Sequence, residues 1–144
     1  MDIEPGLAVR GRPARIRLIL DNILANALFH SPGDGVVRLA LRRDGDRILL
    51  SVRDHGPGVP ERHLRDIFRA FFRVDRSRAG SGGGVGLGLA LVRDAAVAMG
   101  GSVEARNAGP GLEIIVSLPP AGPDGGEGND ARFSADPGEE RGGP

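Results

Sequence analysis

The chain has 144 residues, of which 40% are apolar, so it is long enough to form one domain around a hydrophobic core. Its 19 basic residues balance 19 acidic ones, which leaves no net field to attract nucleic acid or an anionic membrane surface. There is no cysteine, which excludes disulfides and thiolate metal sites, and no apolar run reaches the roughly 20 residues of a membrane span.

An amphipathic helix is predicted over residues 13–30. Apolar residues recur there at three- and four-residue spacing, and a proline suits the first turn of a helix. This apolar side is expected to face the core. It consists of Ile16, Ile19, Leu20, Ile23, Leu24, Ala27 and Leu28.

Two short apolar runs follow, over residues 36–41 and 48–52. The intervening "RRDGD" contains Asp44-Gly45, which suits a tight hairpin turn, so the two runs are predicted to pair as antiparallel strands. A short helix is then expected to open at Pro60. Its apolar face would consist of Leu64, Ile67 and Phe68.

The last predicted elements are a helix over residues 86–99, stopped by Gly100-Gly101, and a strand pair over 102–105 and 112–118. Helices therefore lie between two strand pairs. This order predicts an α+β two-layer sandwich, in which helices cover one face of a mixed, mostly antiparallel sheet.

The composition changes after Pro120. Residues 121–144 are rich in glycine and proline and carry six acids and two arginines, which leaves the preceding residues at 17 − 13 = +4. Such a segment buries too little apolar surface to offset the entropy of ordering. We expect a globular domain over residues 1–120 and a disordered tail over 121–144.

Two amides in "LDNILANALFHSP" form the first motif. Asn22 and Asn26 are four residues apart, so their side chains lie about 40° apart on the helix. They could be ordinary solvated polar residues. Alternatively, an amide oxygen is a ligand that Mg²⁺ accepts when nucleotide phosphates and water complete its octahedron.

The second motif, "LLSVRDHGPGVP", places Asp54 at the end of a predicted strand, followed by Gly56 and Gly58. The glycines let the chain turn and leave room for a flat ligand against the backbone. A buried carboxylate there could accept a hydrogen bond from an exocyclic amine such as adenine N6. The other interpretation is a simple turn.

The third motif is "GGGVGLGLAL", residues 82–91. A dinucleotide-binding fingerprint would follow a strand directly, and a P-loop would need a lysine, which the chain lacks. The pattern instead favours a flexible lid over residues 73–83 that closes onto a helix whose first N–H groups face an anion.

The ordered series "NILANALFH", "DHGPGVP", "IFRAFFRVDRSR" and "GGGVGLGLALV", followed by "GLEIIVSLPP", resembles the N, G1, F and G2 boxes of bacterial sensor histidine kinases. The resemblance is to their ATP-binding catalytic domain and covers residues 6–119. This domain has the Bergerat (GHKL) fold with a glycine-rich ATP lid, shared with gyrase, mismatch-repair and heat-shock chaperone ATPases. The resemblance therefore implies ATP and Mg²⁺ as cofactors.

By resemblance, Asn26 is the Mg²⁺ ligand and Asp54 reads adenine. Phe68, Phe71 and Arg73 match the F box, whose aromatic residues anchor the lid. The ATP-binding residues implied are Asn22, Asn26, Phe29, His30, Asp54, Gly56, Gly58, Arg73, Gly84, Val85, Gly86, Leu87, Gly88 and Leu89. The chain departs from the family pattern at Phe29, Ala70, Val85 and Leu112.

Members of the group that hydrolyse ATP are known for a glutamate one turn before the Mg²⁺ asparagine, where this chain has Asn22. An amide cannot act as a general base, so the sequence favours γ-phosphoryl transfer to a protein histidine over hydrolysis. That histidine is expected on a separate dimerisation segment. The chain is expected to lack this segment and also the first strand and helix of the catalytic domain. Neither His30, His55 nor His63 is expected to be the phosphoacceptor, so no catalytic residue is assigned beyond the ATP site.

The partners expected from the resemblance are ATP, the histidine-containing dimerisation segment and a response regulator receiver domain. The start of the chain lacks the apolar core of a signal peptide, so the chain is expected to be cytoplasmic. It is also expected to be monomeric and to contact neither nucleic acid nor the membrane directly. Two other classes stay open. One is a regulatory module, either non-catalytic or an anti-sigma-type serine kinase; the other is a nucleotide-dependent oxidoreductase.

Overall fold

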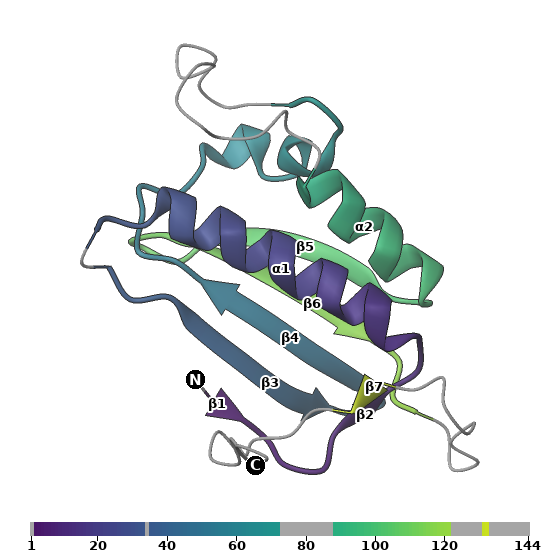
Figure 1. The fold of residues 1–144 in the computed structure, drawn as a ribbon. Helices are drawn as coiled ribbons and strands as arrows, with labels where there is room; N and C mark the ends of the chain where they lie inside the picture. Colours follow the sequence, from purple (N-terminus) through teal and green to yellow (C-terminus); the bar gives the residue numbers. More distant parts are fainter. Residues whose placement is uncertain (1, 34, 73–87, 122–130, 133–144) are drawn as a thin grey trace, which may run out of the picture.

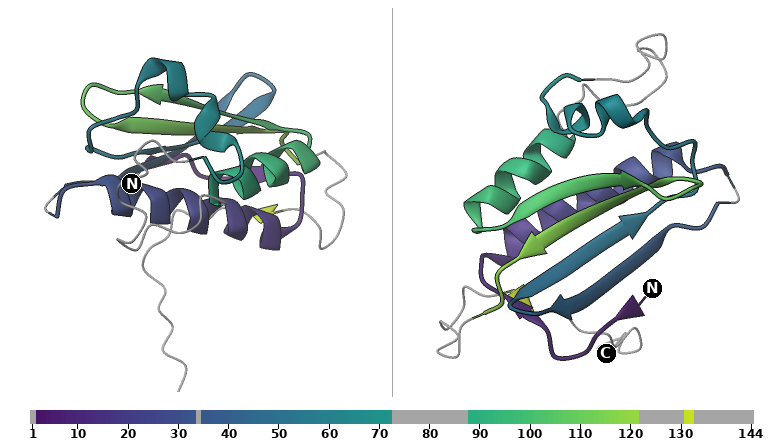
Figure 2. Two further views of the ribbon diagram at one scale, coloured as in Figure 1. Left: turned by 90° about the horizontal axis from the view of Figure 1, so that it is seen from above. Right: turned by 180° about the vertical axis from the view of Figure 1, so that it is seen from behind.

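A computed structural model describes residues 2–33, 35–72, 88–121 and 131–132. Two helices lie against one face of a five-stranded sheet, as the ribbon in Figure 1 and the view from above in Figure 2 show. The elements are β1 (Asp2–Ile3), β2 (Ala8–Val9), α1 (Pro13–His30), β3 (Arg38–Asp44), β4 (Arg47–Arg53), η1 (Glu61–His63), η2 (Asp66–Phe68), α2 (Gly88–Ala98), β5 (Ser102–Asn107), β6 (Leu112–Leu118) and β7 (Ala131–Arg132). The predicted two-layer α+β architecture is confirmed.

The sheet has the strand order β1-β3-β4-β6-β5. Its pairs are antiparallel except for β1, which runs parallel to β3. A mixed, mostly antiparallel sheet was expected, and this expectation is correct. Seen from behind in Figure 2, the other face of the sheet is covered by no helix of the described ranges.

Helix α1 has the predicted bounds, with Pro13 in its first turn. Ile16, Ile19, Ile23 and Ala27 are its buried residues, as the spacing indicates. The prediction is wrong for Leu28, whose side chain is 68% exposed. Consecutive residues on a helix are about 100° apart, so burial of Ala27 turns Leu28 away from the sheet.

Several other predicted elements have different bounds in the structure, with β4 and β5 each longer by two residues. Strand β3 begins at Arg38 instead of Val36 and continues to Asp44, beside the turn. The short helix expected from Pro60 is two separate 3₁₀ turns, η1 and η2. Each is one turn long, as is usual for 3₁₀ structure, and η2 still buries Ile67 and Phe68 as the pattern indicates.

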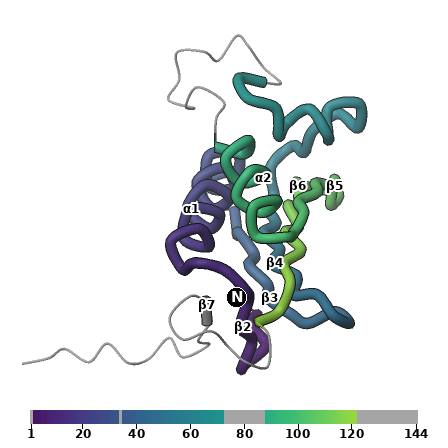
Figure 3. The backbone as a smooth tube through the Cα atoms, turned by 90° about the vertical axis from the view of Figure 1, so that its right-hand side faces the viewer, coloured from purple at the N-terminus to yellow at the C-terminus, as the bar shows by residue number. Residues whose placement is uncertain are grey.

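Helix α2 begins at Gly88 and ends at Ala98, one residue before the expected end. The first two residues of the predicted helix, 86 and 87, lie outside the described residues. Figure 3 shows α1 and α2 together on one side of the strands. In the part of the chain that the structure describes, neither helix is long and apolar enough to cross a bilayer.

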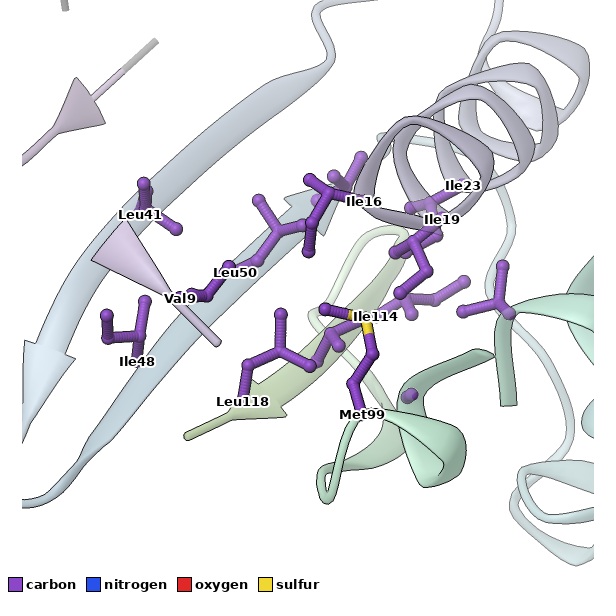
Figure 4. Packing of buried hydrophobic residues seen from close by; sticks show 14 of the residues in the cluster. Val9, Ile16, Ile19, Ile23, Leu41, Ile48, Leu50, Met99, Ile114 and Leu118 are labelled. Atoms are coloured by element: carbon purple, nitrogen blue, oxygen red, sulfur yellow. The ribbon is translucent and has the colours of Figure 1, made fainter. Parts of the chain in front are cut away.

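The core fills the space between these two layers. Alternate residues of β4 and β6 point toward the helices, so that Ile48, Leu50, Ile114 and Leu118 are buried. Figure 4 shows Leu50 and Ile114 beside the isoleucines of α1 and Ile48 near Val9, with Met99 reaching in from the end of α2. This packing fixes the position of α1 relative to the sheet.

Strand β7 lies within the segment expected to be a disordered tail. Ala131–Arg132 pairs antiparallel with Ala8–Val9 of β2, close to the start of α1 (Figure 1). A tail without fixed structure was expected here, and these two residues pair because backbone pairing does not need an apolar side chain. Residues 122–130 and 133–144 of the tail lie outside the described residues.

Candidate functional site

The two asparagines of α1 lie in its C-terminal half, and both are half-buried. The Nδ2 of Asn22 donates to the Leu18 carbonyl oxygen at 2.8 Å, which fixes the orientation of this amide. Asn26 forms no side-chain hydrogen bond with the described residues, so its Oδ1 is available to a ligand. His30 continues the same i, i+4 row along the helix.

Asp54, which follows β4 directly, is the only buried charged residue in the described part of the chain, at 2% exposure. Its Oδ1 accepts hydrogen bonds from the backbone N–H of Gly56 at 2.9 Å and of Leu112 at 3.1 Å. The second oxygen, Oδ2, accepts none from the described residues. The carboxylate is thus held rigidly and keeps one acceptor for a ligand.

Two close contacts bring the separate motifs together along α1. Gly56 packs against the carbonyl oxygen of His30, so the segment after β4 meets the end of the helix. A Cβ on Gly88 would lie 2.9 Å from the Oδ1 of Asn22, so the start of α2 meets the helix two turns earlier. These contacts are about 12 Å apart along the helix axis, and Asn26 lies between them.

The other predicted site residues of this region lie around the same row. Gly58 has a φ of +76°, and its Cα lies against the side chain of Asn107. Phe29 is 45% exposed and makes an edge-to-face contact with His30, at 5.0 Å between ring centroids. Leu89 in the first turn of α2 is half-buried. The structure therefore places them near the asparagines and Asp54.

The two F-box phenylalanines lie in different environments, and the lid that they are predicted to anchor lies outside the described residues. Phe68 is buried, whereas the ring of Phe71 is 70% exposed and its backbone has a φ of +66°. Phe72 packs against the core instead, 5.2 Å from the ring of His63. Because Phe71 adopts a left-handed backbone conformation, its side chain turns out and Phe72 takes the inner position.

The predicted lid cannot be compared with the structure. Arg73 and residues 84–87 of the proposed ATP site lie outside the described residues, as does the lid over 73–83. The described part of the site therefore consists of α1, the segment after β4 and the first turn of α2.

The hairpin between β5 and β6 was predicted as a strand pair, but its support of the segment after β4 was not. Gly111 packs against the carbonyl oxygen of Asp54 with no room for a Cβ, and Asn107 hydrogen-bonds both backbone groups of Val59. Arg53 donates to the carbonyl oxygens of Ala108 and Pro110. The glycines of the connecting segment "NAGPG", residues 107–111, were the one signal of this close packing in the sequence.

The donor set limits the chemistry of this site. No group of three or more His, Asp or Glu side chains that could hold a metal occurs in the described ranges. A metal ion held by Asn26 would therefore need further oxygen ligands from a bound molecule or water, as Mg²⁺ commonly obtains from phosphates. The arrangement suits a phosphorylated ligand with an amine-bearing ring near Asp54.

Comparison with known families agrees with this arrangement. Residues 11–122 match the family described as histidine kinase-, DNA gyrase B-, and HSP90-like ATPase. The signal transduction histidine-protein kinase AfsQ2 of Streptomyces coelicolor is 36% identical over 132 residues, or 88% of this chain and 24% of AfsQ2. The chain thus spans about a quarter of the length of this curated relative.

Solved structures of similar fold lead to the same family. The mycobacterial sensor histidine kinase MprB superimposes with a TM-score of 0.69 at 30% identity, over 83% of this chain and 81% of that one. The ATP binding domain of PrrB from Mycobacterium tuberculosis gives a TM-score of 0.64 at 29% identity, with coverages of 85% and 82%.

Proposed function

The chain belongs to the histidine kinase-, DNA gyrase B- and HSP90-like ATPase family as an ATP-binding catalytic domain of the sensor histidine kinase type, and we propose that its site uses Mg²⁺-ATP as a phosphoryl donor. The observation that supports this most directly is the row Asn22, Asn26 and His30, which joins the start of α2 to the segment carrying Asp54. A nucleotide along this row would have its base at Asp54 and its phosphates at α2.

The base side depends on Asp54. Its Oδ1 is occupied by two backbone donors, so Oδ2 is left to accept from an exocyclic amine. Adenine carries that amine on C6, whereas guanine has a carbonyl oxygen at the same ring position, which a carboxylate repels. We therefore assign adenine selectivity to Asp54, with Gly56 and Gly58 leaving space for the ring.

The phosphate side depends on Asn26 and the beginning of α2. The free amide oxygen of Asn26 fits a Mg²⁺ ligand, and bound Mg²⁺ would supply charge neutralisation for the phosphates. The first N–H groups of α2 have no partner within the helix, and the helix dipole favours an anion there. Leu89 would contact the nucleotide beside them, and Phe29 and His30 would border the site on α1. Residues 73 and 84–87 complete this proposed site from outside the described residues.

Transfer is favoured over hydrolysis by the groups around Asn22. Its amide cannot take a proton from water, and the nearest acid, Asp21, is exposed and lies 3.8 Å from Arg17. Asp21 is also about 100° away from Asn22 around the helix. Phosphoryl transfer needs mainly positioning and charge neutralisation, which this site can provide without a base of its own.

The acceptor is proposed to be a histidine on a dimerisation segment of the longer protein, and the phosphoryl group would then pass to a receiver domain of a response regulator. None of the three histidines of this chain is proposed as the acceptor: His55 Nδ1 lies 2.6 Å from the Val36 carbonyl oxygen, and His63 lies beside Asp66. We propose that the domain works in the cytoplasm, where ATP is available.

A single experiment separates the candidate functions. The chain is incubated with Mg²⁺-ATP labelled at the γ-phosphoryl group and a histidine-bearing dimerisation segment, and the label is recovered as phosphohistidine, phosphoserine or free phosphate. The proposal predicts phosphohistidine on the added segment. Phosphoserine would favour the anti-sigma type of kinase, and free phosphate alone would show an ATPase.

The remaining alternatives concern binding. A folded chain that binds no nucleotide would be a degenerate regulatory module. Affinity for NAD would support an oxidoreductase, but the described sheet is mostly antiparallel, whereas dinucleotide folds use a parallel one. We therefore expect titration with NAD to give no binding heat.

A further inference from the structure

Asn107, the last residue of β5, uses its side-chain amide to hold the backbone of Val59. Its Oδ1 accepts from the Val59 N–H at 2.9 Å, and its Nδ2 donates to the Val59 carbonyl oxygen at 2.6 Å. The amide thus bonds both backbone groups of one residue, as a neighbouring strand would. The two residues are 48 positions apart, so this contact ties the β5–β6 hairpin to the segment after Asp54.

This contact is the main polar support of that segment. In the described part of the chain, Asn107 alone hydrogen-bonds the backbone of residues 57–59. A Cβ on Gly58 would lie 2.6 Å from the Oδ1 of Asn107, so the amide also packs directly against the turn. Loss of the amide would therefore leave the backbone of residues 57–59 without its hydrogen bonds.

The hairpin that carries Asn107 is itself held at Asp54. Leu112 donates its N–H to the Asp54 Oδ1 and accepts from the Asp54 N–H at 3.0 Å. Arg53 holds the turn of the hairpin through the carbonyl oxygens of Ala108 and Pro110, at 3.1 and 3.2 Å. One rigid unit therefore positions both the carboxylate of Asp54 and the backbone at Val59.

We propose that Asn107 is a positioning residue of the nucleotide site, which sets affinity for the adenine end of the ligand by holding Gly58 and Val59 beside Asp54. This inference rests on the proposed function. Asn107 acts through the Val59 backbone and hydrogen-bonds none of the described phosphate-side residues, so we expect it to affect the base side only.

The test is calorimetric titration of the full chain with Mg²⁺-ATP and, separately, with Mg²⁺ inorganic triphosphate, which has no base. Asn107→Ala is expected to lower the affinity for Mg²⁺-ATP about tenfold, which is equivalent to about 1.4 kcal/mol of binding free energy. Affinity for triphosphate should stay within about twofold of the unsubstituted chain. Asn107→Asp should lower the affinity for Mg²⁺-ATP by a similar factor, because a carboxylate can accept from the Val59 N–H but cannot donate to the Val59 carbonyl oxygen.

The matched control is Arg106→Ala, in the neighbouring position of β5, whose side chain pairs with Glu113 at 2.8 Å and forms no hydrogen bond or ion pair with the described segment after β4. It should leave both affinities unchanged. Amide hydrogen exchange gives a second readout, since Val59 should exchange faster in Asn107→Ala only.

Each other outcome overturns a stated part of the account. If Asn107→Ala lowered the affinities for ATP and triphosphate by the same factor, Asn107 would only stabilise the fold. Normal ATP affinity in Asn107→Ala would remove the positioning role while leaving the proposed function intact. Failure of the unsubstituted chain to bind Mg²⁺-ATP would overturn the proposed function, and the role of Asn107 with it.

Discussion

At the scale of single residues, function depends on which polar atoms the fold leaves without an internal partner. The Oδ1 of Asp54 is fully used by Gly56 and Leu112, whereas Oδ2 has no partner among the described residues. Asn26 likewise keeps its amide free, while Asn22 is turned by its bond to Leu18. Two residues of one motif therefore take different positions: Asn26 can bind a ligand, and Asn22 borders the start of α2.

Asp54→Asn tests the base-reading role. In the variant, the amide oxygen can accept from the N–H groups of Gly56 and Leu112 only if the NH₂ group points toward the adenine amine. Two hydrogen-bond donors would then face each other. ATP affinity is expected to fall about tenfold to a hundredfold, and affinity for inorganic triphosphate about twofold at most. Both are measured by calorimetry.

The control for this substitution is Asp94→Asn on the exposed side of α2, which removes the same charge away from the site. It should bind both ligands normally. If Asp54→Asn weakened ATP and triphosphate by the same factor, the carboxylate would not be reading the base.

At the scale of elements, the site depends on how closely α2 approaches α1. Gly88 permits this approach, since a Cβ there would lie 2.9 Å from the Oδ1 of Asn22. Alanine is a better helix former than glycine by about 0.5–1 kcal/mol. Gly88→Ala should therefore keep or raise the melting temperature while displacing the Asn22 amide and weakening Mg²⁺-ATP severalfold.

The control is Ala98→Gly, at the exposed end of the same helix. It should lower the melting temperature and leave the affinity for Mg²⁺-ATP unchanged. Calorimetry and thermal unfolding measure both variants. A Gly88→Ala variant with normal affinity would show that the contact between α2 and Asn22 has no part in binding.

The elements also show which features could be predicted from sequence. Helix α1 and strand β6 have their predicted bounds because their apolar periodicity is continuous over the whole element. The 3₁₀ turns after Pro60 were missed because three residues are too few to give a period. Asp54 was found through its own motif, whereas Asn107 was not, because its partner Val59 is 48 residues away.

At the scale of the whole molecule, the two ends of α1 have different roles. Its C-terminal half carries the asparagines of the candidate site, while its start lies near the small sheet of β2 and β7 (Figure 1). Composition could not predict β7, because glycine, proline and acids around a strand carry no information about its partner. The position of β7 nevertheless makes part of the C-terminal segment a component of the fold.

A chain ending at Ala121 tests that role. Removal of β7 takes away the pairing of Ala8–Val9 with Ala131–Arg132, which we expect to cost about 1–2 kcal/mol, while the Ala121 N–H keeps its bond to the Ala8 carbonyl oxygen. The melting temperature should fall by several degrees in differential scanning calorimetry, with Mg²⁺-ATP affinity within about twofold of the full chain. An unchanged melting temperature would show that β7 contributes nothing to stability.

The most direct test of the account is titration of Mg²⁺-ATP into the full chain and into Asn26→Ala, with Leu28→Ala on the exposed side of α1 as the control. The account predicts Mg²⁺-dependent binding by the full chain and by the control, and an affinity lower by at least about tenfold in folded Asn26→Ala. Binding that is independent of Mg²⁺ and unchanged in Asn26→Ala would contradict it.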